Sequence, residues 1–108
     1  MSLHKFYFTY GNDDQQPYRG GWTEVFAPDG HLACMAFRVA HPDRIPNILN
    51  CSSVYTEEEF AKTNMVGARG NFGFRCREVI IFNITVHGKE VMENESEEAD
   101  PAAKRSPV

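Results

Sequence analysis

Residues 55–60 read Tyr-Thr-Glu-Glu-Glu-Phe and mark a helix start in the middle of the chain. Thr56 and Glu59 have the spacing of a capping box, in which each side chain accepts a hydrogen bond from the other residue's backbone N–H. The two flanking aromatic residues have the spacing of a hydrophobic staple, and three glutamates occupy the first turn, where the helix dipole favours negative charge. The stretch predicts a helix over residues 57–64.

Segments that favour β-structure lie on both sides of this helix. Residues 51–55 (Cys-Ser-Ser-Val-Tyr) form a short strand candidate that ends at the capping box. Residues 67–73 contain three glycines and predict a loop, and residues 74–86 are rich in valine and isoleucine. We therefore expect a strand, the helix, a loop and a longer strand in this half of the chain.

The N-terminal half predicts a hairpin followed by a second helix. Residues 5–10 are dense in aromatic residues, and residues 22–27 alternate between two faces, so we expect two antiparallel strands joined by a polar loop. Asp29 is the best N-cap candidate, and Pro42 ends the helix. Between them, apolar residues recur at helical spacing at Ala33, Ala36, Phe37 and Ala40.

These elements give the order β-β-α-β-α-β, which is typical of an α+β domain. We expect a small antiparallel or mixed sheet with both helices on one face. The predicted domain covers residues 4–88, and the polar, acidic composition of residues 89–108 predicts a disordered tail. With 108 residues, of which 42% are apolar, the chain can build one core.

The charge distribution argues against nucleic acid as the partner. The net charge is −4, and six acidic and three basic side chains lie in residues 88–108. The remaining body is therefore close to neutral, whereas a non-specific nucleic-acid binder carries a marked positive charge.

Cysteine use and hydropathy bear on location. The chain has three cysteines, an odd number, and lacks an apolar segment long enough for a signal peptide or a membrane span. We expect a reduced, cytoplasmic protein that does not enter a membrane.

Cysteine and histidine residues are the candidates for metal or nucleophilic chemistry. They are His31, Cys34, His41, Cys51, Cys76 and His87. No two cysteines have the short spacing of a zinc site, and no cysteine lies in a local signature of a nucleophile. The glycines of residues 67–73 lack the lysine and following helix of a phosphate loop. The sequence therefore predicts no catalytic residue, no metal ligand and no cofactor.

Aromatic and arginine residues are the candidates for binding, because this composition is typical of interface hot spots. Aromatic residues flank the first polar loop, and arginines are scattered through the body. The predicted binding residues are Tyr10, Tyr18, Trp22, Arg44 and Arg75.

Four segments carry a resemblance to known proteins: residues 6–11 (Phe-Tyr-Phe-Thr-Tyr-Gly), 21–25 (Gly-Trp-Thr-Glu-Val), 41–44 (His-Pro-Asp-Arg) and 50–58, with Asn-Cys at its start and Tyr-Thr-Glu-Glu at its end. The chain resembles a group of small uncharacterised proteins encoded by gut Firmicutes, their phages and mobile elements. The similarity extends from residue 4 to about residue 80. The group supplies no activity, and the resemblance implies only an accessory protein that engages host machinery.

Three functions follow from these observations. The first is a non-enzymatic binding module with a protein partner. The second is a small-ligand or nucleotide binder that uses the aromatic residues with Arg44 or Arg75. The third is a cysteine- or metal-dependent enzyme, which the missing motifs argue against.

Overall fold

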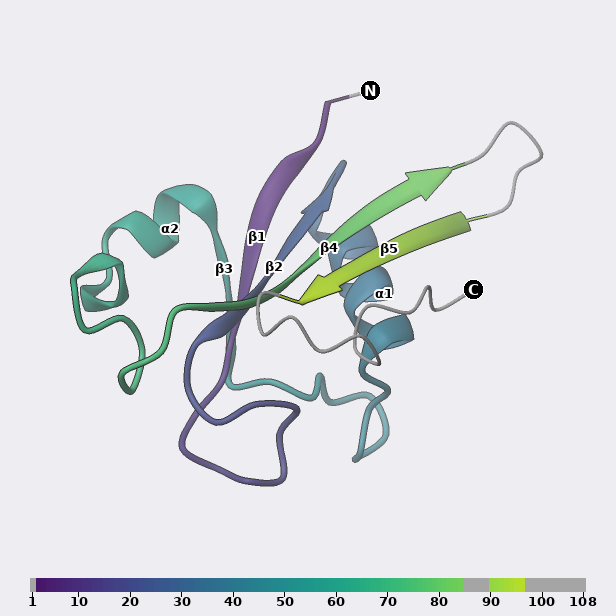
Figure 1. Cartoon of the computed structure of the whole chain (residues 1–108). Helices are drawn as coiled ribbons and strands as arrows, with labels where there is room; N and C mark the ends of the chain where they lie inside the picture. The colour runs from purple at the N-terminus through teal and green to yellow at the C-terminus, as the bar shows by residue number, and fades with distance from the viewer. Residues whose placement is uncertain (1, 85–89, 97–108) are drawn as a thin grey trace.

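The computed structural model describes residues 2–84 and 90–96, and Figure 1 shows their arrangement. The elements are β1 (His4–Thr9), β2 (Trp22–Ala27), α1 (Gly30–Ala40), β3 (Ser53–Thr56), α2 (Glu57–Ala61), the 3₁₀ helix η1 (Asn64–Val66), β4 (Cys76–Ile84) and β5 (Glu90–Ser96). The structure confirms the α+β class and the predicted order β-β-α-β-α-β.

The strands form one mixed sheet with the order β3-β1-β2-β4-β5. Strand β1 pairs antiparallel with β2, so that His4 faces Ala27 and Thr9 faces Trp22. This pairing confirms the predicted hairpin. Strand β2 runs parallel to β4, and β5 pairs antiparallel with β4.

The two helices lie on opposite faces of the sheet, and the prediction of both helices on one face is wrong. Phe37 of α1 stacks on Phe8, with ring centroids 4.4 Å apart, whereas Phe60 of α2 stacks on Tyr7 at 3.9 Å. Neighbouring residues of a strand point to opposite faces. Both faces of β1 are aromatic, so each can bury a helix; in Figure 1, α2 lies beside β3 and β1 and α1 lies behind the sheet.

Two hydrophobic clusters follow from this arrangement. The α1-side cluster is the larger and includes Phe8, Val25, Phe37 and Ile80. The α2-side cluster is small and consists of Tyr7, Trp22 and Phe60, with partly buried residues around them.

The helix starts agree with the sequence signals. The Asp29 side chain accepts a hydrogen bond of 2.9 Å from the N–H of Leu32 at the start of α1. Both bonds of the Thr56–Glu59 capping box are present. Helix α2 is shorter than predicted because the Thr63 hydroxyl bonds to Phe60 O at 2.8 Å and then caps η1.

Strand β5 lies within the segment that the sequence analysis expects to be disordered. Residues 90–96 pair with β4 from Glu78 to Ile84, and this pairing satisfies the outer backbone groups of a long strand. The rest of the expected tail, residues 97–108, lies outside the described residues, as do residues 85–89.

Candidate functional site

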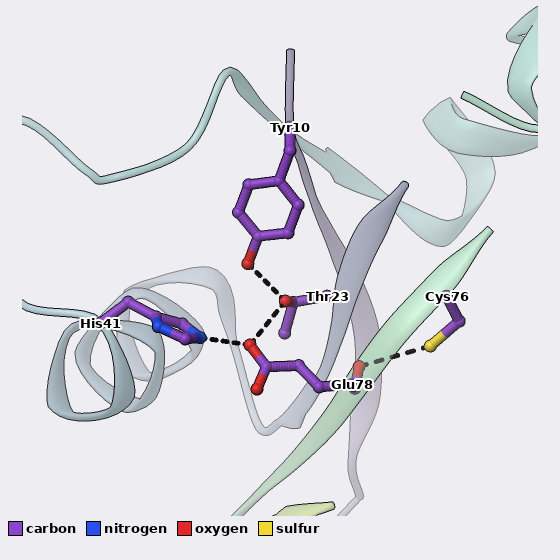
Figure 2. A network of polar contacts seen from close by, with 5 residues as sticks. All are labelled: Tyr10, Thr23, His41, Cys76 and Glu78. Carbon is purple, nitrogen blue, oxygen red and sulfur yellow. Dashed lines mark hydrogen bonds and ion pairs between the residues drawn. The ribbon is translucent and has the colours of Figure 1, made fainter. Parts of the chain in front are cut away.

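Strand β4 carries a buried carboxylate. The Glu78 side chain is 1% exposed, and the Thr23 hydroxyl of β2 donates a hydrogen bond of 2.8 Å to its Oε2 atom. The Tyr10 phenol lies 2.5 Å from the Thr23 hydroxyl, as Figure 2 shows. Because the Thr23 proton is used on Glu78, Tyr10 donates to Thr23 and the three groups form one chain of hydrogen bonds.

His41 joins this chain to helix α1. It is the C-cap residue of the helix, and its Nε2 atom contacts Glu78 Oε2. The imidazole also packs against Phe37 and Tyr18, with ring centroids 5.1 Å and 6.2 Å away. A buried carboxylate is tolerated where donors satisfy it. The contact therefore fixes the end of α1 to the centre of the sheet.

A β-bulge directs Glu78 towards the helix. Trp22 pairs with Cys76 and Thr23 pairs with Glu78, so Arg77 is one extra residue in β4. Cys76 packs against the α2-side cluster, whereas Glu78 bonds Thr23 beneath α1. In a regular strand, residues two apart share a face, so the bulge separates them.

This buried network is closed to a substrate. Tyr10 and Thr23 are 0% exposed, and only the edge of the His41 side chain, at 17%, reaches the surface. Burial raises the pKa of Tyr10 well above its ordinary value, so the phenol stays protonated near neutral pH. The geometry assigns the network to the fold, where it holds α1 against β2 and β4.

A tight turn at residues 71–74 stands in contrast to that network. Asn71 and Phe74 exchange two backbone hydrogen bonds of 2.7 Å and 3.1 Å. Between them, Phe72 has a φ of 54° and Gly73 a φ of 83°. Positive φ at both central residues is the mark of a type I′ turn, which favours asparagine and glycine. Phenylalanine in this conformation is strained by about 1–2 kcal/mol.

The turn is held firmly against the first hairpin. The Asn71 side-chain amide donates to Tyr10 O at 2.7 Å and to Gly21 O at 2.9 Å. The Gly21 N–H donates in return to Asn71 O at 2.9 Å. A Cβ atom at Gly21, where φ is 72°, would collide with Arg75 O. Glycine is therefore required for this close approach.

The turn displays aromatic and arginine side chains. Phe72 is 62% exposed and Phe74 is 45% exposed. The Arg77 guanidinium lies 3.9 Å from the Phe74 ring centroid, and the Arg75 guanidinium lies 5.5 Å from that of Trp22. A shallow hollow of about 590 Å³ lies beside the turn and is lined by Asn64, Arg69, Gly70, Phe72 and Gly73.

We call this region the hairpin surface and define it by Arg69, Phe72, Phe74, Arg75 and Arg77. Residues 66–77 contain these three arginines and no acidic residue. The surface therefore combines exposed rings with positive charge, although the body of the chain is close to neutral.

The predicted binding residues do not form one surface. Tyr10 and Trp22 are buried, at 0% and 3% exposure. Tyr18 is half-buried, and its ring packs at 5.4 Å from that of Tyr10. Arg75 belongs to the hairpin surface, and Arg44 lies in a separate pocket.

The Arg44 pocket is small, at about 160 Å³. Its lining includes Asp13, Gln16, Ile45, Ile48 and Cys51. Arg44 itself donates a hydrogen bond of 2.7 Å to the Gln15 side chain. The pocket thus lies between the first polar loop and the connection that follows α1.

Sequence reasoning missed Phe72, Phe74 and Glu78. The glycine-rich stretch was expected to be a connecting loop, and a phenylalanine at the first central position hides the usual asparagine–glycine signal of a tight turn. Nothing in the sequence indicated that Glu78 is buried, because a single glutamate in a β-rich run can equally well lie on the exposed face of the strand.

The cysteines bear on the prediction of metal or nucleophilic chemistry. None of the three forms a disulfide. Cys51 packs against the α1-side cluster and Cys76 against the α2-side cluster. Burial raises the pKa of Cys34, and it raises that of Cys51 to about 12. In the described part of the chain, no group of three or more His, Cys, Asp or Glu side chains could hold a metal ion.

No family model, curated protein or solved structure matches this chain. Among the described residues, no helix is long and apolar enough to cross a membrane.

Proposed function

We propose that this chain is a non-enzymatic binding module that engages a protein partner through the hairpin surface. The resemblance to small proteins of phages and mobile elements favours a host protein as that partner. The absence of disulfides among the three cysteines fits the cytoplasm expected from the sequence.

The exposed ring of Phe72, together with the strained backbone conformation of this residue, carries this proposal. The side chain is 62% exposed, so it contributes little to the core, and its left-handed backbone is unfavourable for a bulky residue. Strain of this kind concentrates at functional sites. An exposed aromatic ring at the tip of a turn is also well placed to enter a pocket on a partner.

The neighbouring residues fit an interface hot spot. Arginine and aromatic residues are enriched in such hot spots, and here arginines lie against the rings of Phe74 and Trp22. The positive charge favours a partner surface that is acidic as well as apolar.

The anchoring of the turn supports binding by a preformed surface. Asn71 and Gly21 fix the turn through side-chain and backbone hydrogen bonds. Little conformational freedom is then lost when a partner binds, and this raises the affinity of a small contact.

Affinity capture from bacterial lysate, followed by calorimetry with the purified partner, tests the proposal. Phe72→Asn should weaken binding by about 30-fold, because loss of a hot-spot anchor removes about 2 kcal/mol. Ile48→Asn is the matched control, since Ile48 is 56% exposed but lies beside the Arg44 pocket. A partner that is lost with Ile48→Asn and retained with Phe72→Asn would contradict the assignment.

A small-ligand or nucleotide site at the Arg44 pocket is the second candidate. Arg44 and apolar side chains line it, which suits an anionic ligand with an apolar part. Its volume of about 160 Å³ is below the usual range of ligand pockets, roughly 300–1,000 Å³. In thermal-shift measurements, a ligand at about 100 times its Kd should add roughly 2.7 kcal/mol of stability. No shift with any nucleotide would remove this candidate.

An enzyme that uses a cysteine nucleophile is less well supported. The thiolate is the reactive form, and burial raises the pKa of both Cys34 and Cys51. The acidic and basic groups of the buried network are closed to substrate. These observations favour binding over catalysis.

A further inference from the structure

The hollow beside the turn at residues 71–74 is large enough for a side chain of a partner. Its volume is about 590 Å³, within the usual range of ligand pockets, roughly 300–1,000 Å³. The exposed ring of Phe72 supplies an apolar wall, and Asn64 and Arg69 supply polar groups. The hollow is open at Gly73, because a Cβ atom at this position would meet no atom within 4 Å. An apolar side chain can therefore pack against the ring of Phe72 without moving the turn.

Positive charge is concentrated in the segment that forms this hollow. Residues 60–77 contain Lys62 and three arginines and no acidic residue. Arg75 and Arg77 both donate hydrogen bonds to backbone carbonyl oxygens, which are neutral acceptors. These contacts orient the two guanidinium groups without cancelling their charge. A partner surface that carries carboxylates is therefore attracted to this region.

Arg69 is the arginine that lines the hollow itself. The residue is exposed, so its guanidinium can accept a carboxylate as a partner, and such a pair can form two parallel hydrogen bonds. A carboxylate bound to Arg69 lies next to the group that occupies the hollow. The hollow and Arg69 together therefore select an apolar side chain and an acidic group that are neighbours in the partner.

The charge of the whole chain favours a short acidic segment over a nucleic acid. The net charge is −4, although residues 60–77 are positive, so the rest of the chain is more negative than the chain as a whole. A long polyanion would extend beyond the positive segment and be repelled there. A few carboxylates can stay within it.

We propose that the hairpin surface recognises a short acidic segment of the partner that carries one large apolar side chain. The apolar side chain packs in the hollow against Phe72, and a neighbouring carboxylate pairs with Arg69. This inference rests on the proposed function and deepens it by naming the chemistry of the partner segment.

Three fluorescein-labelled nonapeptides test this chemistry on the full chain by fluorescence anisotropy. The first has a tryptophan with two glutamates on each side and ends of glycine and serine. The second has alanine in place of the tryptophan, and its Kd should be about tenfold higher because the anchor is lost. The third has glutamines in place of the glutamates, and at low salt its Kd should be about three- to tenfold higher. Equal binding of the three peptides, or no binding of the first, would overturn the proposal.

Salt separates the two parts of the recognition. At about 1 M salt, where the Debye length is near 3 Å, the tryptophan peptide and its glutamine version should bind equally. The weaker binding of the alanine peptide should remain. A difference between the first and third peptides that persists at high salt would contradict pairing between exposed charges.

Arg69→Gln tests the carboxylate contact. It should weaken binding of the glutamate-containing tryptophan peptide by about threefold and leave the Kd of the glutamine version unchanged. Arg38→Gln is the matched control, because it removes the same charge from α1, where Arg38 pairs with Asp43 at 2.9 Å. The control should leave both Kd values nearly unchanged. An equal loss in the two variants would mean a general charge effect and overturn the role of Arg69.

Backbone amide NMR signals locate the bound peptide. The tryptophan peptide should shift the signals of Gly70 and Gly73 and leave those of α1 in place. Shifts in α1 alone would overturn the site. A labelled oligothymidylate is the competing polyanion, and tighter binding of this probe with the same dependence on Arg69 would assign the surface to nucleic acid and overturn the proposal.

The proposed function and the chemistry of the partner segment can fail separately. If Phe72→Asn loses the captured partner but the tryptophan peptide does not bind, recognition of an acidic segment is wrong and the proposed function stands. If the peptides bind in the expected order but Phe72→Asn retains the captured partner, the proposed function fails instead.

Discussion

The network around Glu78 and the turn at residues 71–74 are both built from polar contacts between distant parts of the chain. In the network, the side chains form hydrogen bonds with one another, and Glu78 is only 1% exposed. In the turn, the Asn71 side chain and the backbone satisfy one another, and the side chain of Phe72 is left 62% exposed. The polar side chains of the network therefore stabilise the fold, whereas the turn leaves an aromatic side chain available to other molecules.

Removing the buried carboxylate should have the largest effect on stability. Glu78→Ala leaves His41 and Thr23 without their acceptor, and breaking a buried pair destabilises a protein by about 3–5 kcal/mol. The free energy of unfolding from urea titration measures the change. Glu78→Gln retains an acceptor for Thr23 and should cost about 1–2 kcal/mol.

The milder variant also separates the two regions. Glu78→Gln should bind the partner with the wild-type Kd, because the residue lies beneath α1 and away from the hairpin surface. A large loss of binding in a folded Glu78→Gln protein would mean that the network takes part in function.

Substituting the glycine beneath the turn should have the next largest effect. Gly21→Ala combines a φ of 72° with a collision against Arg75 O, so we expect a loss of about 2 kcal/mol. Gly73→Ala is the matched control, because its φ is 83° but no atom lies within 4 Å of the new Cβ. It should cost about 1 kcal/mol in thermal or urea unfolding. Equal losses for the two variants would show that the close approach at Gly21 has no energetic weight.

Phe72→Asn should have a smaller effect of the opposite sign. It creates the asparagine–glycine pair that type I′ turns favour, and so it should raise the free energy of unfolding by about 0.5–1 kcal/mol. The same variant should bind the partner poorly. A destabilised Phe72→Asn protein would indicate that the ring supports the fold and would remove the main argument for function.

Alkaline pH should lower the free energy of unfolding through the buried titratable groups, and the turn at residues 71–74 should not contribute to this fall. Burial raises the pKa of Cys51 from 9.0 to about 12 and that of Tyr10 well above 10.0. Each group keeps its proton in the folded chain at pH values where the unfolded chain loses it. Stability is therefore unchanged below about pH 9 and falls as the pH rises from 9 towards 12.

Urea titrations at pH 7, 8.5 and 10 measure this fall. Cys51→Ser should reduce the slope, whereas Phe72→Asn should retain the wild-type slope because its side chain does not titrate. A stability that stays constant from pH 7 to pH 10 would contradict the burial of these groups.

Local signals in the sequence were sufficient for most of the fold. The capping box at Thr56, the N-cap at Asp29 and the alternation in residues 22–27 each depend on neighbours along the chain, and all three were confirmed. The placement of the helices could not be read in this way. Residues on both faces of β1 are aromatic, so the sequence did not say which face each helix covers.

The candidate site was harder to predict because it depends on tertiary contacts. Of the predicted binding residues, Arg75 alone lies on the hairpin surface. Tyr10 and Trp22 are buried because both faces of the sheet are covered near the end of β1. The exposure of Phe72 follows from the anchoring of Asn71 to residues 50 and 61 positions away in the chain. No local pattern contains that information.

The extra residue in β4 has a consequence for engineering. Before Arg77, the side chain of Cys76 packs against the α2-side cluster. After Arg77, the side chain of Glu78 lies beneath α1. The bulge is therefore a suitable boundary for loop grafting. A foreign recognition loop can replace residues 67–75 without changing the register between β2 and β4 after the bulge. Deletion of Arg77 would make Cys76 and Glu78 adjacent opposite Trp22 and Thr23, so the two side chains would keep their opposite faces and only the bulge would be lost.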